Sequence, residues 1–322
     1  MIKTYLFSGD ETTEDVALAD WRSLTEGDGR LLWVDVRSVT QHELELLQGA
    51  FGLHDLAVAP VMGRYHRPHL YQFADHFCVN LVMIRSSRSN HGIKPVELHV
   101  FVGDKFILTT TKDLTSPPVD SAIEEYKNAP QLAAKGSMYA LYLLSEDLVE
   151  TYYPLVDKLD DDADKIEDIL LDRVDKASLR RNFALKSKVF ELRKLLGPQR
   201  DIFNDLARRD FGFIDTRSQV YFQDIYNRMI RLFDILDTVR EILSGNLEIY
   251  LSTVSNRLNE IMKVLTVFAT ILGLGTLVTG FYGMNFRHMP GLESPHAFRN
   301  VLIFIVAISV TMLFWFRRKK WV

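Results

Sequence analysis

The stretch VLTVFATILGLGTLVTGFY, residues 264–282, contains no charged residue in 19 positions. A helix rising about 1.5 Å per residue over this length nearly covers a hydrocarbon core of about 30 Å. A second apolar run, VLIFIVAISVTMLFWF (301–316), is shorter, but Ala297 and Phe298 extend it while Arg299 reaches the interface. Each run alone is compatible with a buried core helix. Two such runs in succession predict two membrane spans.

The second run is followed directly by RRKKW (317–321), which combines four cations with an interfacial aromatic side chain. This pattern places the C-terminus inside the cell, and two spans then place the N-terminus inside as well. The first 15 residues contain no apolar core of a secretory signal. Cys78 is the only cysteine, as is compatible with a reducing compartment. We therefore expect a multi-pass protein of the inner (plasma) membrane with both termini in the cytoplasm.

Residues 1–135 have the pattern of a cytoplasmic α/β domain. Four segments are rich in β-branched and aromatic residues, namely LLWVDVRS (31–38), HFCVNLVMI (76–84), ELHVFVG (97–103) and KFILTTT (105–111). Gly103-Asp104 predicts a tight turn that joins the last two as a hairpin. Residues 41–52 have helical spacing with a glycine at their end.

Several functional classes leave no trace in the sequence. There is no glycine-rich phosphate loop, no nucleophile elbow and no HExxH motif, and the histidines are scattered without ligand spacing. We therefore expect no enzyme and no resident cofactor. The net charge of −4 gives no basic signature, so we expect no nucleic-acid partner.

Residues 136–215 are predicted to form a helical hairpin. The segment 146–176 contains 12 acidic and 4 basic residues, and its apolar residues recur at spacings of three and four. It is expected to be one amphipathic helix whose acidic face is either simply solvated or concentrates cations near the membrane. A basic helix over 176–209 is expected to pack against it in an antiparallel hairpin.

A third helix is predicted over residues 216–283, because no proline occurs between Arg217 and Tyr282. If continuous, the 66 residues from Arg217 to Tyr282 form a rod of about 100 Å that runs from water directly into the first span. The remaining parts are an outer loop (284–300), the second span (301–317) and a basic tail (318–322). A simple membrane anchor does not need such a helix, whereas a pore whose opening is controlled from inside the cell would use it well.

Polar and small residues follow one side of the first span. At 100° per residue, Leu265, Gly273 and Thr276 fall at about 300°, 20° and 320° relative to Met262, so the four share a stripe about 80° wide. Asn285 lies at about 140°, and its use by the same stripe requires the helix to end or turn near Gly283. Packing between helices of an oligomer explains the stripe as well as a narrow conduit does.

The stretch Tyr282-Gly283-Met284-Asn285-Phe286 resembles the YGMNF signature of the CorA family of divalent-cation transporters. It stands at the outer end of the first of two C-terminal spans, ahead of a basic tail ending KKWV. YLSTVSN (250–256) and NRLNEIMKVLTVFATI (256–271) resemble the family's approach to the pore. FGLHDLAV and YHRPHLYQF resemble its N-terminal domain, so the similarity extends over essentially the whole chain.

The resemblance implies a fold and a set of site residues. The fold is a funnel-shaped homopentamer, with an N-terminal α/β domain, long helices and two C-terminal transmembrane helices in the lipid bilayer. The implied filter consists of Gly283, Met284 and Asn285, where a ring of amides holds hydrated Mg²⁺ through its water shell. The implied pore lining consists of Glu248, Asn259, Met262, Leu265, Gly273 and Thr276, with Met262 and Leu265 as an apolar gate.

Three departures from the family pattern bear on ion choice and regulation. The outer loop reads MPGL (289–292) instead of MPEL, keeps Glu293, and adds Arg287, His288, His296 and Arg299. A Met-Pro pair usual in the first span is replaced by Gly273-Leu274. The family senses internal Mg²⁺ with a carboxylate pair, of which Asp224 matches one member while Ala59-Pro60 stands where the other belongs. His54 or Asp55 would be needed as a substitute, so we expect internal Mg²⁺ to close this channel weakly or not at all.

The transported ion stays open between two readings. The intact YGMNF favours Mg²⁺, with Co²⁺ or Ni²⁺ as surrogates, whereas the unusual loop favours a zinc transporter like the ZntB relatives in the family. A two-span scaffold or signalling protein would not require Asn285. A membrane metallohydrolase using the acidic segment 157–172 would require a ligand or nucleophile cluster that the sequence does not show.

Overall fold

The computed structural model describes residues 1–19, 21–63, 67–86, 93–172, 175–208, 216–286, 291, 294–319 and 321. The chain divides into two compact units. One comprises Met1–Glu167 with Arg180–Ser244, and the other comprises Asp168–Leu179 with Gly245–Val322.

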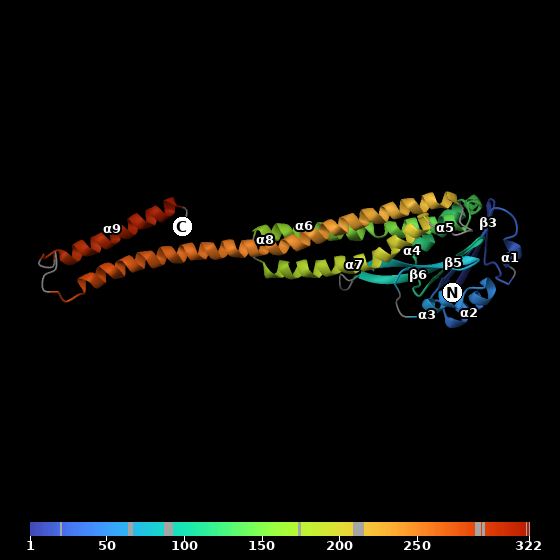
Figure 1. Cartoon of the computed structure of the whole chain (residues 1–322), viewed down its shortest axis with the longest axis horizontal. Coiled ribbons are helices and arrows are strands. Elements are labelled where there is room, and N and C mark those ends of the chain that lie inside the picture. The colour runs from blue at the N-terminus through green and yellow to red at the C-terminus, as the bar shows by residue number, and fades with distance from the viewer. Residues whose placement is uncertain are drawn as a thin grey trace. The chain divides into compact units, whose positions relative to one another are not determined.

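The first unit is built on a seven-stranded sheet (Figure 1). Its strands are β1 (Ile2–Ser8), β2 (Glu11–Glu14), β3 (Arg30–Arg37), β4 (His69–Gln72), β5 (His76–Ser86), β6 (Ile93–Gly103) and β7 (Phe106–Thr111). The order is β2-β1-β3-β7-β6-β5-β4, in which β3 and β7 run parallel and the other neighbours run antiparallel. The four predicted strands are confirmed as β3, β5, β6 and β7, and β1, β2 and β4 were not predicted.

The predicted hairpin at Gly103-Asp104 is confirmed, with Val102 opposite Ile107 in the β6–β7 ladder. Gly103 is needed for its small size. A Cβ atom added there would lie 2.1 Å from the ring of Phe106, which is part of the core. The turn residue therefore lets an aromatic core side chain close over the end of the sheet.

Helices cover both faces of this sheet (Figure 1). The described residues form the helices α1 (Trp21–Leu24), α2 (Gln41–Phe51), α3 (Asp55–Met62), α4 (Pro117–Asn128), the 3₁₀ helix η1 (Pro130–Lys135), α5 (Ser137–Glu150), α6 (Tyr153–Asp172), α7 (Lys176–Arg208), α8 (Thr216–Tyr282) and α9 (Ala297–Arg318), of which α9 lies wholly in the second unit. Helices α2 and α3 share one apolar core with β3, β7 and parts of β5 and β6.

The predicted helix over 41–52 is confirmed as α2, and its ends explain its length. Thr40 and Glu43 form a capping box, in which each side chain binds the backbone N–H of the other residue. Gly52 ends the helix in the left-handed conformation with φ 68°, which costs glycine nothing.

The single amphipathic helix predicted over 146–176 is wrong, because the chain breaks it into α5 and α6 at Thr151 and Tyr152. Pro154 is the physical reason. It has no N–H to donate to the carbonyl of Glu150, and its ring would collide with that carbonyl in a continuous helix. The predicted apolar stripe is nevertheless present on α6, where the buried residues are Val156, Leu159, Ala163, Ile166 and Leu170.

A polar joint ties the long helices to the sheet. Strand β4 pairs with β5 only as far as Asn80, so β4 does not pair with β5 at Val82. Gln199 of α7 accepts a hydrogen bond from the Val82 N–H at 2.9 Å, and the Tyr152 hydroxyl donates to the Val82 carbonyl. Helix α7 thereby completes the hydrogen bonding of a buried strand edge.

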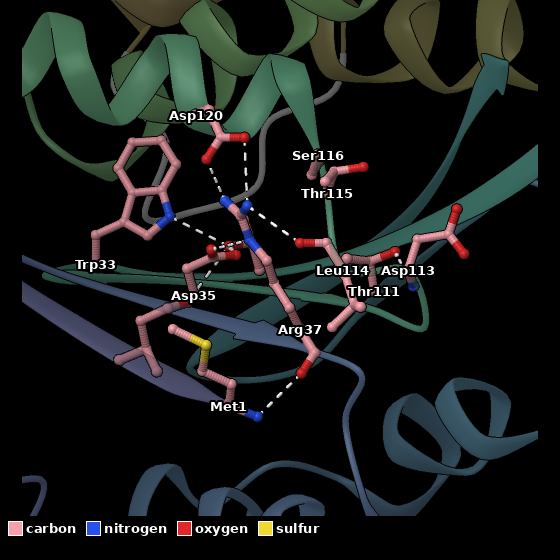
Figure 2. A network of polar contacts seen from close by, with 12 residues as sticks. Met1, Trp33, Asp35, Arg37, Thr111, Asp113, Leu114, Thr115, Ser116 and Asp120 are labelled. Atoms are coloured by element: carbon pink, nitrogen blue, oxygen red, sulfur yellow. Dashed lines mark hydrogen bonds and ion pairs between the residues drawn. The ribbon is translucent and has the colours of Figure 1, made fainter.

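A second polar network centres on Arg37 at the end of β3 (Figure 2). Its guanidinium binds the buried Asp35 carboxylate, with Nε 2.8 Å from Oδ2, and it also pairs with Asp120 of α4. Asp35 in turn accepts a hydrogen bond from the Thr109 hydroxyl at 2.8 Å. Burial raises the pKa of Asp35 above its ordinary value, even though Arg37 and Thr109 act to lower that pKa.

The second unit contains the membrane-length helices. The C-terminal part of α8 and the whole of α9 are long and apolar enough to cross a membrane, and their apolar side chains are largely exposed in the single chain. The predicted continuity of the third helix is confirmed, since α8 has no break between Thr216 and Tyr282.

Candidate functional site

Helix α8 ends at Tyr282. An end at this point is what Asn285 needs in order to join the side of the helix that carries Met262 and Thr276. The Gly283 N–H still donates to the carbonyls of Thr279 (2.9 Å) and Gly280 (3.2 Å), and the next residues leave the helix. Gly283 does not have a positive φ. The absence of a side chain at Gly283 lets the backbone pass close to the Thr279 carbonyl oxygen, which would lie 3.2 Å from an added Cβ. Asn285 is exposed and outside regular structure, so its amide is released from the geometry of the helix.

The threonines of the first span orient their hydroxyl hydrogens toward their own helix. Thr276 donates to the carbonyl of Leu272 at 2.9 Å, and Thr279 donates to that of Gly275 at 3.0 Å. A hydroxyl group has one hydrogen and two lone pairs. Because the hydrogen is used within the helix, the oxygen presents its lone pairs outward and acts as an acceptor, as a hydrated cation requires.

The continuity of α8 brings the predicted pore residues of the stalk onto the same side as those of the span. Relative to Met262, Asn259 lies at about 60° and Glu248 at about 40° on a regular helix. Together with Leu265, Gly273 and Thr276 they occupy a sector about 120° wide. All six are exposed in the single chain, with Met262 56% and Leu265 58% exposed. The chain alone leaves this face uncovered.

Asp224, the candidate regulatory ligand, is already paired. Its carboxylate lies 2.8 Å from Nε of Arg228, one turn further along α8. The other two nitrogens of that guanidinium bind Glu146 (2.9 Å) and Glu150 (2.7 Å) of α5. One cation thus holds three carboxylates from two helices. The spacing of Asp224 and Arg228 was visible in the sequence but its significance was missed, and the contact with α5 had no sequence signal.

The residues suggested as substitutes for the missing acidic partner have local roles. His54 caps α3 by accepting a hydrogen bond from the Leu56 N–H at 3.1 Å, and its ring stacks on Phe73. Asp55 accepts a hydrogen bond from Gln48. Ala59 and Pro60 lie within α3 and offer no ligand atom on their side chains.

The acidic face of α6 holds carboxylates close to one another. The pKa of Asp160 is raised, first by burial and then by the neighbouring carboxylates of Asp164, Asp161 and Asp157. Within the described residues, no group of three or more His, Cys, Asp or Glu side chains is placed to hold a metal ion.

The outer loop is only partly described. Arg287, His288, Glu293 and most of the MPGL segment lie outside the described residues, whereas His296 and Arg299 are exposed at the start of α9. Close to it, Phe281 and Met284 help line an apolar groove of about 760 Å³, together with Asn300, Val301 and Phe304 of α9.

Comparison with known proteins supports the resemblance to the CorA family. A family model of the CorA-like Mg²⁺ transporter protein matches residues 28–318. The cobalt/magnesium transport protein CorA of Thermotoga maritima is 32% identical over 294 residues, which cover 90% of this chain and 83% of that protein. The zinc transport protein ZntB of Pectobacterium carotovorum is 25% identical over 266 residues, which cover 80% and 78%.

The fold agrees with a solved structure as well. The complete structure of the CorA magnesium transporter from Methanocaldococcus jannaschii matches 99% of this chain and 98% of its own with a TM-score of 0.77, at 22% identity. Membership of a transporter family favours transport over the scaffold and hydrolase alternatives. The chain belongs to the CorA-like Mg²⁺ transporter family, and it is a membrane transporter of divalent cations rather than an enzyme.

Proposed function

We propose that the chain forms a homopentameric Mg²⁺ channel of the inner membrane, in which five copies of α8 surround the pore and both termini lie in the cytoplasm. The observation that carries the proposal is the end of α8 at Tyr282, which leaves Asn285 free immediately beyond a membrane-length helix. The filter then consists of Gly283, Met284 and Asn285 at the outer mouth.

The chemistry of an amide ring suits this ion. Mg²⁺ gives up its water shell reluctantly, so a filter that binds the hydrated ion avoids the cost of dehydration. Neutral carbonyl oxygens of Asn285 accept hydrogen bonds from the shell without the strong attraction of a carboxylate ring. The ion is therefore bound firmly enough to enter and weakly enough to leave.

The uncovered sector of α8 provides the rest of the path. Thr276 offers outward lone pairs to the hydrated ion, and Gly273 leaves room beside it. Met262 and Leu265 form an apolar constriction, which stops ions when it loses its water. Asn259 and Glu248 supply polar rings further toward the cytoplasm.

Zinc transport by the same architecture is the second candidate. It is favoured by the replacement of MPEL with MPGL in the outer loop and by the added histidines, since imidazole suits Zn²⁺ better than Mg²⁺. A relative that is 25% identical to this chain bears the name zinc transport protein ZntB, which supports this candidate. Co²⁺ and Ni²⁺ are expected to pass as surrogates in either case.

The test uses purified full-length protein in liposomes loaded with a Mg²⁺- or Zn²⁺-responsive dye. We expect Mg²⁺ uptake by the wild type, its loss in Asn285→Ala, and its retention in Asn300→Ala, which removes an exposed amide from the start of α9. Zn²⁺ uptake with little Mg²⁺ uptake would replace the magnesium proposal with the zinc one. Unchanged Mg²⁺ uptake in Asn285→Ala would rule out the amide filter.

A further inference from the structure

A polar cavity of about 560 Å³ lies beside α8 in the second unit. Its walls include Asn256, Asn259, Lys263 and Met262 of α8, and Trp321 from beyond the end of α9. Most of the wall is therefore able to donate hydrogen bonds, and Met262 joins the cavity to the proposed gate.

The cavity lies partly beside the sector of α8 that holds the proposed pore residues. On a regular helix Lys263 and Asn256 lie at about 100° and 120° from Met262, outside the sector that holds the proposed pore residues. Met262, Asn259 and Thr266, the last at about 40°, belong to both the cavity wall and that sector. A ligand bound by Lys263 and Asn256 would touch Met262 from outside the sector and would not stand in the path of the ion.

Trp321 is held against the last turns of α9. The Trp321 N–H donates to the Phe316 carbonyl at 3.1 Å, and the two rings lie 5.6 Å apart. Phe316 itself is only 5% exposed. These contacts hold the indole in place as one wall of the cavity.

The charge around the cavity is positive. Lys263 lines the cavity and is opposed by Glu260, while the exposed Arg317, Arg318 and Lys319 stand just before Trp321. The lining itself carries one cation and one carboxylate, and the excess of positive charge comes from the three cations that precede Trp321 in the sequence. This excess favours an anion over a metal ion. Basic clusters at the cytoplasmic end of a membrane helix, and basic pockets between such helices, are typical binding sites for anionic lipid headgroups. A tryptophan side chain at the end of a transmembrane helix is typical of the membrane–water interface.

We propose that this cavity binds the phosphate headgroup of an anionic phospholipid from the inner leaflet. The Lys263 ammonium and the Asn256 amide bind the phosphate, Trp321 packs against the upper acyl chain, and the occupied cavity restrains Met262. The assignment to the inner leaflet rests on the proposed topology, but the binding itself does not depend on which ion is transported.

The test measures lipid binding separately from ion flux. Full-length protein carrying Trp315→Phe is placed in nanodiscs of phosphatidylcholine with either brominated phosphatidylglycerol or brominated phosphatidylcholine, and indole fluorescence is recorded. We expect several-fold stronger quenching by the anionic lipid. Lys263→Gln should abolish this excess, and Arg299→Gln, which removes a cation from the opposite end of α9, should preserve it.

Each outcome decides one question. Equal quenching by the two lipids, or an excess that survives Lys263→Gln, would overturn the lipid site. An excess that disappears on adding inorganic phosphate would assign the cavity to free anions instead. Lipid-dependent quenching in a protein that carries no Mg²⁺ would support the lipid site and contradict only the proposed ion.

Discussion

Arg228 lies one helical turn after Asp224 on α8, and its Nε is 2.8 Å from the Asp224 carboxylate. The same guanidinium binds Glu146 and Glu150 on α5, so a built-in cation occupies the centre of the acidic group. A divalent ion would have to displace that guanidinium before it could bind these carboxylates. This pairing supports the hypothesis that internal Mg²⁺ regulates this transporter weakly.

The first prediction follows from the ion pair between Asp224 and Arg228. Asp224→Ala should alter inhibition of flux by internal Mg²⁺ by less than about twofold, because an exposed ion pair one turn apart contributes only about 0.3–0.5 kcal/mol. Arg228→Gln should have the larger effect, since it leaves three carboxylates without their cation and should increase Mg²⁺ inhibition. Flux in liposomes with varied internal Mg²⁺ measures both. A strong change in Asp224→Ala alone would contradict the hypothesis.

The second prediction concerns the filter glycine. Gly283→Ala places a Cβ 3.2 Å from the Thr279 carbonyl, so the chain must shift by a few tenths of an ångström where Asn285 leaves the helix. We expect reduced Mg²⁺ flux with normal expression. Gly245→Ala is the control, because no atom lies within 4 Å of an added Cβ there. It should preserve flux and stabilise the helix by up to about 1 kcal/mol.

The third prediction concerns the lone pairs of Thr276. Thr276→Val keeps the shape of the side chain but removes the acceptor, and the loss of one hydrogen bond of about 1 kcal/mol should lower flux about fivefold. Thr311→Val removes a hydroxyl that makes the same bond to the carbonyl one turn earlier on α9, at 2.8 Å. That control should conduct normally. Equal effects of the two changes would show that the hydroxyl matters only for helix structure.

The fourth prediction uses the raised pKa of the buried Asp35. Because folding favours its protonated form, the stability it contributes is present below its unfolded pKa of about 3.9 and is lost as pH rises through the raised folded value. Asp35→Asn cannot ionise. The Tm of Asp35→Asn should therefore rise relative to the Tm of the wild type as the pH is raised from about 4. A difference in Tm that stays constant across this range would contradict the burial argument.

The fifth prediction concerns the joint between α7 and β5. Gln199→Leu leaves the buried Val82 N–H without its acceptor, which should cost about 1–3 kcal/mol. Gln223→Leu removes an exposed hydrogen bond to Asn227 and should cost much less. Thermal unfolding of the two variants side by side measures the difference.

The sequence was most informative where local chemistry decides the structure. Thr40, Glu43 and Gly52 determine both ends of α2 with contacts inside a few residues. The apolar run ending at Tyr282 likewise predicts the end of α8. Pro154 stands between two stretches of helical apolar spacing, and its missing N–H, rather than that spacing, decides the break between α5 and α6.

Features that depend on distant partners had no such signal. Strand β1 has a strand-like composition, but its position between β2 and β3 depends on pairing with segments elsewhere in the chain. Gln199 and Val82 are joined only because α7 packs against the part of β5 that extends beyond β4. The Arg228 contacts with Glu146 and Glu150 likewise arise from the packing of α5 against α8.

The continuity of α8 also sets an order of events during synthesis. Residues 1–263 are translated before Val264, which at about 5–20 residues per second takes roughly 13 to 53 s. By then the sheet, α5 and α7 have been made, and the early turns of α8 emerge next to partners that are ready to receive them. The membrane half of the helix therefore follows an anchored half into the bilayer. A substitution that delays folding of the soluble unit is expected to appear as a defect of membrane insertion.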